Sequence, residues 1–462
     1  MHLTKLEQST KTLKMLTMSP ISPGETLDRK LVPVEQGMEI LNRLAKSSYV
    51  VTMSRVKGPL SEEILRQALD LIQYRYPCLN SRIVGSLDNL CFETEGVSKI
   101  PLRVVDNLYN EHWQEVVLEE LNQEIESDKG LMRAVLVRAE SENSANYLIT
   151  SIHHAISDGL SCVRLHSAIL TYCDKIHCGE PITSVLPLPI LPPIDRLIPI
   201  STRGLQGIWH RSLLLLRIIF NQVWYRPKTL GFEKCVPINL RRCGMVQKSL
   251  DKGLTQELIN RCKKEKTTVH GALCGAMLLT AAKSITANKK KRLCVSCLSY
   301  VDLRRRLEPV VSDEVMGMLI SGVTSYHTLQ SNLSFWDLAR SVKKQLESRL
   351  KKANLFRFVM IIKAGIKWFI RHPNKGSATV SVTNIGKVNI PKHYGSFELE
   401  EISFVAAEGA GGGTLSVAVS TFEEKMILNF IFSEPSISKN SMEKMANNVL
   451  SCLIDGCLTK VA

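Results

Sequence analysis

The cysteines of this chain follow none of the spacings that mark a zinc site or a disulfide framework. There are 13 cysteines in 462 residues, an odd number scattered along the sequence. The lone CxxC element, Cys294 to Cys297, lies in an apolar stretch typical of a buried strand, so we interpret its thiols as structural. We therefore expect no metal ion. Because the first residues also lack the apolar core of a secretory signal, we expect a cytoplasmic protein.

Aromatic residues are few, and no nucleic-acid-binding motif accompanies the basic residues. Aromatic side chains make up 6% of the chain, while 59 Lys and Arg against 44 Asp and Glu give a net charge of +15. We expect no nucleic-acid partner. The charge suits a polyanionic small molecule or an acidic protein, or it is a general property of the surface. No GK[ST] follows the glycine-rich run 409–413, which excludes a phosphate loop of that type.

Length and proline content predict two domains joined by a connector. A chain of 462 residues suits two domains of about 200 residues each. Six prolines between Pro181 and Pro199 indicate an extended segment. An apolar stretch interrupted by arginines, 207–226, is predicted as an amphipathic helix that either packs on the protein or makes peripheral membrane contact. We divide the chain into residues 1–184, 185–240 and 241–462.

Hydrophobic periodicity predicts alternating strands and helices, the pattern of an α/β protein. In the first half we predict strands at 49–56, 131–138 and 147–152, and helices from about residue 61 and after residue 159. In the second half we predict a helix at 267–279, strands at 293–301, 379–386, 415–421 and 428–432, and a last helix at 439–453.

The segment HHAISDG, from His153 to Gly159, joins a predicted strand to a predicted helix, a place where clefts form. An uncharged imidazole takes a proton from a hydroxyl or an amine near neutral pH. Asp158 can fix the local geometry, and Gly159 leaves room for a substrate. We predict His154 as the general base and Asp158 as the second catalytic residue, although a histidine beside a strand can also be a core residue. His153, on the opposite face of the strand, is predicted to hold the turn by hydrogen bonds.

The HHxxxDG pattern at 153–159 resembles the signature of the CoA-dependent acyltransferase and condensation-domain superfamily. The VDLR segment ending at Arg304 and the SVTNIG segment 381–386 resemble segments of the same superfamily, closest to polyketide-associated and alcohol O-acyltransferases. The DFGWG box of the plant branch is absent. The resemblance implies an α/β fold of two chloramphenicol-acetyltransferase-like subdomains in a V-shaped pseudo-dimer with a central tunnel.

The resemblance also implies roles for residues outside the histidine pair. Arg304 would pair with Asp158 and tie the two halves together, and the alternative is a solvated basic turn. Asn384 would bind the acyl carbonyl or the pantetheine arm of a donor, and the alternative is a turn formed with Gly386. Gly159 and Asn384 are thus predicted substrate-binding residues, whereas His153 and Arg304 are predicted structural ones.

From the resemblance we expect an acyltransferase of natural-product or lipid biosynthesis that acts as a monomer. It would move an acyl group from a CoA or acyl-carrier-protein thioester to a hydroxyl acceptor, with no cofactor beyond that thioester substrate. One alternative is a free-standing condensation enzyme that forms an amide on an amine acceptor. The other is a non-catalytic scaffold that binds a carrier protein or a membrane. The VDLR segment favours ester formation.

Overall fold

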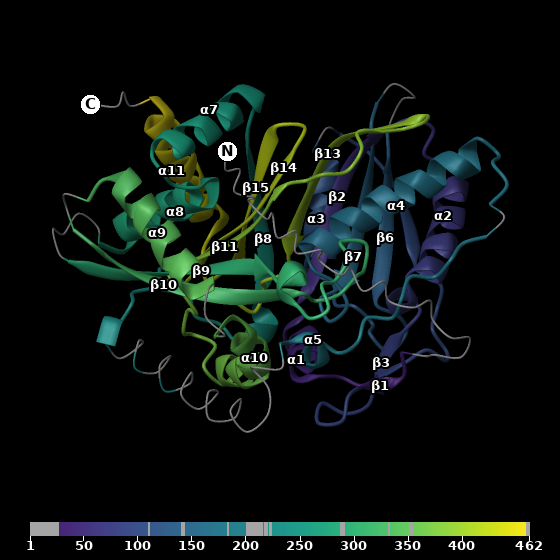
Figure 1. Cartoon of the computed structure of the whole chain (residues 1–462), viewed down its shortest axis with the longest axis horizontal. Coiled ribbons are helices and arrows are strands. Elements are labelled where there is room, and N and C mark those ends of the chain that lie inside the picture. Colours follow the sequence, from purple (N-terminus) through teal and green to yellow (C-terminus); the bar gives the residue numbers. More distant parts are fainter. Residues whose placement is uncertain are drawn as a thin grey trace, which may run out of the picture.

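The computed structural model describes residues 27–109, 111–139, 144–182, 184–199, 216, 220, 224–286, 292–330, 333–350 and 354–458. They form a mixed α/β fold with two sheet-rich halves that lie side by side (Figure 1). The predicted amphipathic helix at 207–226 falls largely outside the described residues. Between Ser184 and Pro199, where most of the prolines lie, the described chain has one short helix, α5 (Ile194–Leu197), and otherwise no regular secondary structure.

The sheet of the N-terminal half has six strands, mostly antiparallel. Their order is β12 (His393–Tyr394), β13 (Phe397–Ala406), β2 (Tyr49–Lys57), β7 (Asn146–His153), β6 (Met132–Arg138) and β5 (Leu102–Asp106). Helix α4 (Gly159–His177), backed by α2 (Glu62–Arg75), covers one face, and α3 (His112–Glu120) packs on the other. A small sheet of β1 (Arg29–Lys30), β4 (Cys91–Glu93) and β3 (Arg82–Val84) lies beside them.

The sheet of the C-terminal half also has six strands, and three of them run parallel. Their order is β10 (Ile320–Leu329), β9 (Leu293–Asp302), β11 (Val380–Lys387), β14 (Leu415–Phe422), β15 (Lys425–Glu434) and β8 (Arg242–Leu250). One face packs against α7 (Lys252–Lys264), α8 (Val269–Thr286), α9 (Phe335–Leu350) and α11 (Lys439–Leu458). Helix α8 is long and apolar enough to cross a membrane, but 56% of it is buried in this core.

Strands β12 and β13 come from the second half of the chain yet complete the N-terminal sheet. Strand β13 pairs with β2 from Glu398 opposite Lys57 to Ala406 opposite Val50. The next strand, β14, returns to the C-terminal sheet. The region 241–462, which we assigned to one subdomain, therefore contributes to both sheets.

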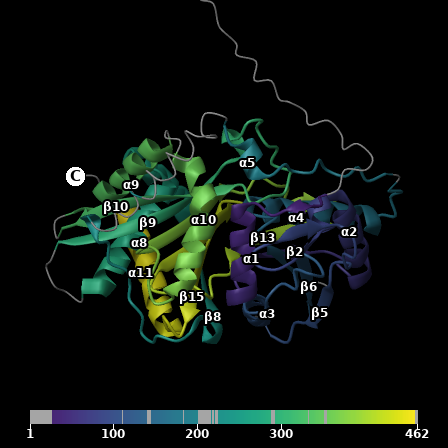
Figure 2. The same ribbon diagram turned by 90° about the horizontal axis from the view of Figure 1, so that it is seen from below.

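Two helices that we did not predict cover the seam between the halves. Helix α1 (Pro33–Ala45) of the N-terminal half packs against α10 (Asn354–Arg371) of the C-terminal half. Figure 2 shows the two helices running side by side. The packing is close, because a Cβ atom at Gly37 would lie 2.8 Å from the side chain of Ile366.

Candidate active site

The turn between β7 and α4 holds His154 by its backbone and by one ring nitrogen. The His154 amide donates to the carbonyl of Ser48, the residue just before β2, at 3.0 Å. Its Nδ1 atom lies 2.6 Å from the Ser157 carbonyl oxygen. A carbonyl oxygen only accepts, so Nδ1 carries the proton and Nε2 keeps its lone pair. Nε2 has no hydrogen-bond partner among the described residues, and the side chain is partly exposed.

The surroundings of His154 favour its uncharged form. Burial lowers the pKa of the imidazole below the usual 6.5, and it outweighs the Ser157 carbonyl and the Asp158 carboxylate, which act in the opposite direction. A neutral imidazole with a free Nε2 lone pair can accept a proton at neutral pH.

The neighbouring His153 is buried and points to helix α1. Its Nε2 lies 2.8 Å from Oε2 of Glu39, and both side chains have no exposed surface. Its Nδ1 accepts a hydrogen bond from the Ala155 amide at 3.1 Å, within the turn that carries His154. Ser127 donates to the other oxygen of Glu39 at 2.6 Å. Burial raises the pKa of Glu39, but the contacts with His153, Ser127 and Arg43 lower it by more, so that the pKa falls below its usual value and Glu39 stays a carboxylate.

These contacts are those of a residue that fixes the turn, the structural role predicted for His153. Glu39 was missed. The sequence offers one faint signal for it, because Glu35, Glu39 and Asn42 form a polar stripe at helical spacing on the buried side of α1. Its partner His153 lies far along the chain, so only the fold brings them together.

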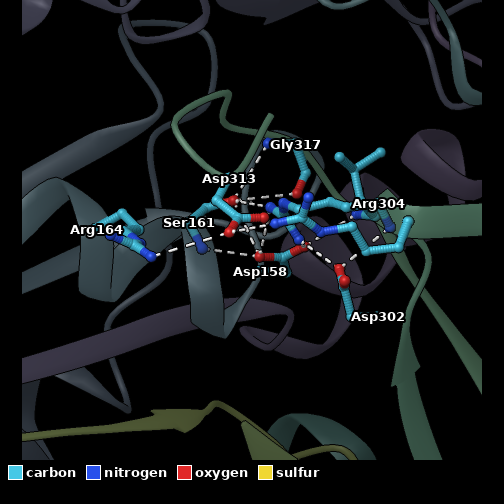
Figure 3. A network of polar contacts seen from close by, with 9 residues as sticks. Asp158, Ser161, Arg164, Asp302, Arg304, Asp313 and Gly317 are labelled. Atoms are coloured by element: carbon cyan, nitrogen blue, oxygen red, sulfur yellow. Dashed lines mark hydrogen bonds and ion pairs between the residues drawn. The ribbon is translucent and has the colours of Figure 1, made fainter. Parts of the chain in front are cut away.

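Asp158 faces Arg304 from the other half (Figure 3). The Arg304 guanidinium donates to both carboxylate oxygens, at 2.8 and 3.0 Å, and neither residue is exposed. Asp158 also caps α4, where it accepts from the Ser161 amide at 2.9 Å, and it accepts from the Leu319 amide at 3.1 Å. Arg304 donates in addition to Asp302 at 2.8 Å.

Asp158 lies where the resemblance placed it, opposite Arg304. Its oxygens are turned to Arg304, Ser161 and Leu319, and its catalytic role stays a prediction. Burial raises the pKa of the carboxyl, whereas Arg304 lowers it more, so Asp158 is ionised. Burial likewise lowers the pKa of Arg304, and Asp158 raises it more. The pair is the contact between halves that the resemblance implied.

The two predicted substrate-binding residues, Gly159 and Asn384, both have contacts within the protein. A Cβ atom at Gly159 would lie 2.6 Å from the Phe404 ring of β13, so the space that we expected to be open to substrate holds an aromatic side chain. Asn384 accepts a hydrogen bond from the Gly386 amide at 2.8 Å, at a point where Gly386 has a φ of 73°. This is the turn alternative, and it leaves the Asn384 amide nitrogen available.

A cavity of about 50 Å³ lies between the histidine turn and the segment 315–319. Ala155, Ile156 and Met316 are among the residues that line it, and His154 is not. The cavity therefore does not define the central tunnel, which stays a prediction.

The fold and the sequence both match known proteins. Residues 29–187 match the family model of the condensation domain, and residues 240–433 match that of the phthiocerol/phthiodiolone dimycocerosyl transferase C-terminus. The comparison with curated proteins gives no match.

Solved structures resemble this one along nearly the whole chain. A trichothecene 15-O-acetyltransferase from Fusarium sporotrichioides is 14% identical, with 95% of this chain and 97% of that chain covered and a TM-score of 0.74. Polyketide synthase associated protein 5 from Mycobacterium tuberculosis is 17% identical, with 94% and 99% covered and a TM-score of 0.68. The first condensation domain of the calcium-dependent antibiotic synthetase is 13% identical, with 95% and 98% covered and a TM-score of 0.69. At these identities the likeness shows the fold.

The two family models cover the parts of the chain that carry the histidine turn and Arg304. With the shared fold, they show that the chain is an acyltransferase-type protein that belongs to the CoA-dependent acyltransferase and condensation-domain superfamily.

Proposed function

We propose that this enzyme transfers an acyl group from a CoA or carrier-protein thioester to a hydroxyl acceptor, with His154 as general base. The observation that carries the proposal is the 2.6 Å contact between Nδ1 of His154 and the Ser157 carbonyl, because it leaves Nε2 as a free, uncharged base. We propose that the enzyme uses no cofactor beyond the thioester substrate and acts in the cytoplasm.

The chemical step moves one proton through His154. Nε2 takes the proton from the acceptor hydroxyl as its oxygen attacks the thioester carbonyl carbon. The tetrahedral intermediate collapses with cleavage of the carbon–sulfur bond. The imidazolium then returns its proton to the leaving sulfur, so that ester and free thiol are formed and His154 is neutral again.

An amine acceptor, and therefore amide formation, is the second candidate. The match of residues 29–187 to the condensation-domain model favours it. The resemblance to a protein named as a 15-O-acetyltransferase and the VDLR segment support the hydroxyl acceptor, and we rank it first.

The test is to incubate the purified full chain with acyl-CoA or an acyl-carrier protein and with alcohol or amine acceptors. Thiol release gives the rate, and mass spectrometry identifies ester or amide. We expect His154→Ala to lower turnover by roughly 10²–10⁴-fold. His393, an exposed histidine of β12, supplies the matched control His393→Ala, which should keep its turnover. Equal turnover in His154→Ala and the wild type would refute the role of His154.

A further inference from the structure

A group of exposed apolar side chains follows the proline-rich connector. Between residues 216 and 225 the structure describes four residues, Leu216, Phe220, Trp224 and Tyr225, and all four are helical. Their exposed fractions are 62%, 58%, 71% and 40%. A single exposed apolar residue is ordinary on a protein surface, whereas several large ones in contact with each other indicate an interaction site.

Three of these side chains lie on one face of the helix. Leu216, Phe220 and Trp224 are spaced by four residues, so successive side chains lie one turn apart on the same side. The rings of Phe220 and Trp224 are stacked, with centroids 5.6 Å apart and planes tilted by 17°. We call these three residues the apolar stripe, because they form one surface that remains exposed.

The C-terminal end of this helix is fixed to the sheet of the C-terminal half. The ring of Tyr225 stacks on Tyr326 of β10, with centroids 4.9 Å apart. Tyr326 is buried, and the guanidinium of Arg349 in α9 also lies over its ring, at 5.8 Å. Adjacent helical residues point about 100° apart. Tyr225 therefore contacts β10 while its neighbour Trp224 stays exposed.

The sequence that carries the apolar stripe is basic. No acidic residue occurs between Asp195 and Glu233. The same stretch contains six basic residues, Arg196, Arg203, Arg211, Arg217, Arg226 and Lys228. An exposed helical face of Leu, Phe and Trp within a basic segment is typical of a helix that lies on the surface of an anionic membrane.

A bilayer fits these observations better than a second copy of the chain. In a twofold contact the same surface patch of each copy faces the other, so two basic segments would be brought together. A leaflet that contains anionic lipid offers the opposite charge, and each Lys or Arg near it adds to the attraction. The headgroup region is also where tryptophan rings are preferentially found.

We propose that the apolar stripe docks the protein on a bilayer surface that contains anionic lipid. Leu216, Phe220 and Trp224 enter the boundary between headgroups and acyl chains, and the basic residues of the segment attract the lipid phosphates and carboxylates. Attachment of this kind is peripheral and does not cross the membrane. It is independent of the proposed acyl transfer, because no residue of the stripe belongs to the site around His154.

The test is flotation of the purified full chain with sealed vesicles. One set is phosphatidylcholine with about 30% phosphatidylserine, and the other is phosphatidylcholine alone. We expect the wild type to float with the anionic vesicles at about 0.1 M salt and to bind at least tenfold less at about 1 M salt, where charges are screened within about 3 Å. Phe220→Ser and Trp224→Ser should each lower the partition coefficient about tenfold, since each removes a large apolar side chain from the lipid.

The matched control is Tyr74→Ser, because the Tyr74 ring is 62% exposed on α2, away from the stripe. It should bind vesicles within about twofold of the wild type, and all three variants should keep the wild-type Tm, since exposed side chains contribute little to stability. A wild type that does not float, or that binds neutral and anionic vesicles equally, overturns the proposal, and so does unchanged binding by Phe220→Ser and Trp224→Ser. Sedimentation velocity tests the competing occupant. A wild type that dimerises without binding vesicles, and a Trp224→Ser variant that stays monomeric, would assign the stripe to a second copy instead.

Discussion

The pair Asp158–Arg304 provides the sharpest test of how the two halves are held together. The perturbations are Asp158→Asn and Arg304→Met, which keep the approximate shapes and remove the charge of one partner at a time. Both side chains are fully buried, and the bond is bidentate, at 2.8 and 3.0 Å. Breaking a buried pair by removing one partner costs about 3–5 kcal/mol, because the other charge is left without compensation.

Each of the two residues keeps other hydrogen-bond partners, so we expect the loss of stability in both variants to lie near the lower end of about 3–5 kcal/mol. Without the Asp158 charge, Arg304 still bonds Asp302, whose side chain is 31% exposed, and Ser161. Without Arg304, Asp158 still accepts from the Ser161 and Leu319 amides. We therefore expect each single variant to lose about 3 kcal/mol, or roughly 6–12 °C in Tm for a unit of about 200 residues. The double variant should lose at least 1 kcal/mol less than the sum of the two, since neither charge remains.

Urea unfolding at neutral pH gives the three free energies, and scanning calorimetry gives Tm. Losses that add within about 0.5 kcal/mol would refute the coupling. The pH dependence is a second readout. The pKa of Asp158 is lowered in the folded protein, so its contribution is complete above the ordinary aspartate pKa of about 3.9 and is lost as the pH falls through the lower folded value. Asp158→Asn should lack this acid-dependent loss.

Three further outcomes follow from the same site. The lowered pKa of His154 places the acid limb of kcat/KM below pH 6.5, because activity is lost only as the pH falls through that pKa; a limb at or above 6.5 would contradict the assignment. Glu39→Ala should cost about 1–3 kcal/mol in urea unfolding, since it leaves the buried groups of His153 and Ser127 that face Glu39 without their partner, and Glu39→Gln should cost less. Gly159→Trp should lower Tm as well as turnover, because the new side chain must displace the Phe404 ring; an unchanged Tm would mean that Phe404 moves freely.

Local signals in the sequence predicted most of the elements around the site. Strand β7 and helix α4 lie where alternation and helical spacing placed them, and the histidine turn lies between them. Strands β9 and β11 were also predicted, since each is a short apolar run, and so was helix α8, although it continues to Thr286, beyond the predicted end at residue 279. In these segments, burial of one face fixes both the local conformation and the pattern of residues.

The missing parts are those whose place depends on distant segments. Helix α1 has an irregular buried face, because Glu39 lies in it, and only the fold shows that the His153 ring faces this carboxylate at 2.8 Å. Strand β13 has an ordinary strand sequence, but nothing local states that it pairs with β2 in the other half. Phe404 at Gly159 follows from that pairing, so the sequence alone left the space above Gly159 open.

The pairing of β13 with β2 also explains why residues from both halves hold the histidine turn. The Ser48 carbonyl accepts from the His154 amide, while the Ser48 amide donates to the carbonyl of Ala407, just past β13. On the other side of the turn, Asp158 is held by Arg304. Residues from the second half thus fix the turn at both ends, through the sheet and through the ion pair. The motif supplies the imidazole and, through the Ser157 carbonyl, its free lone pair at Nε2, while β13 and Arg304 hold the turn that carries them against the second half.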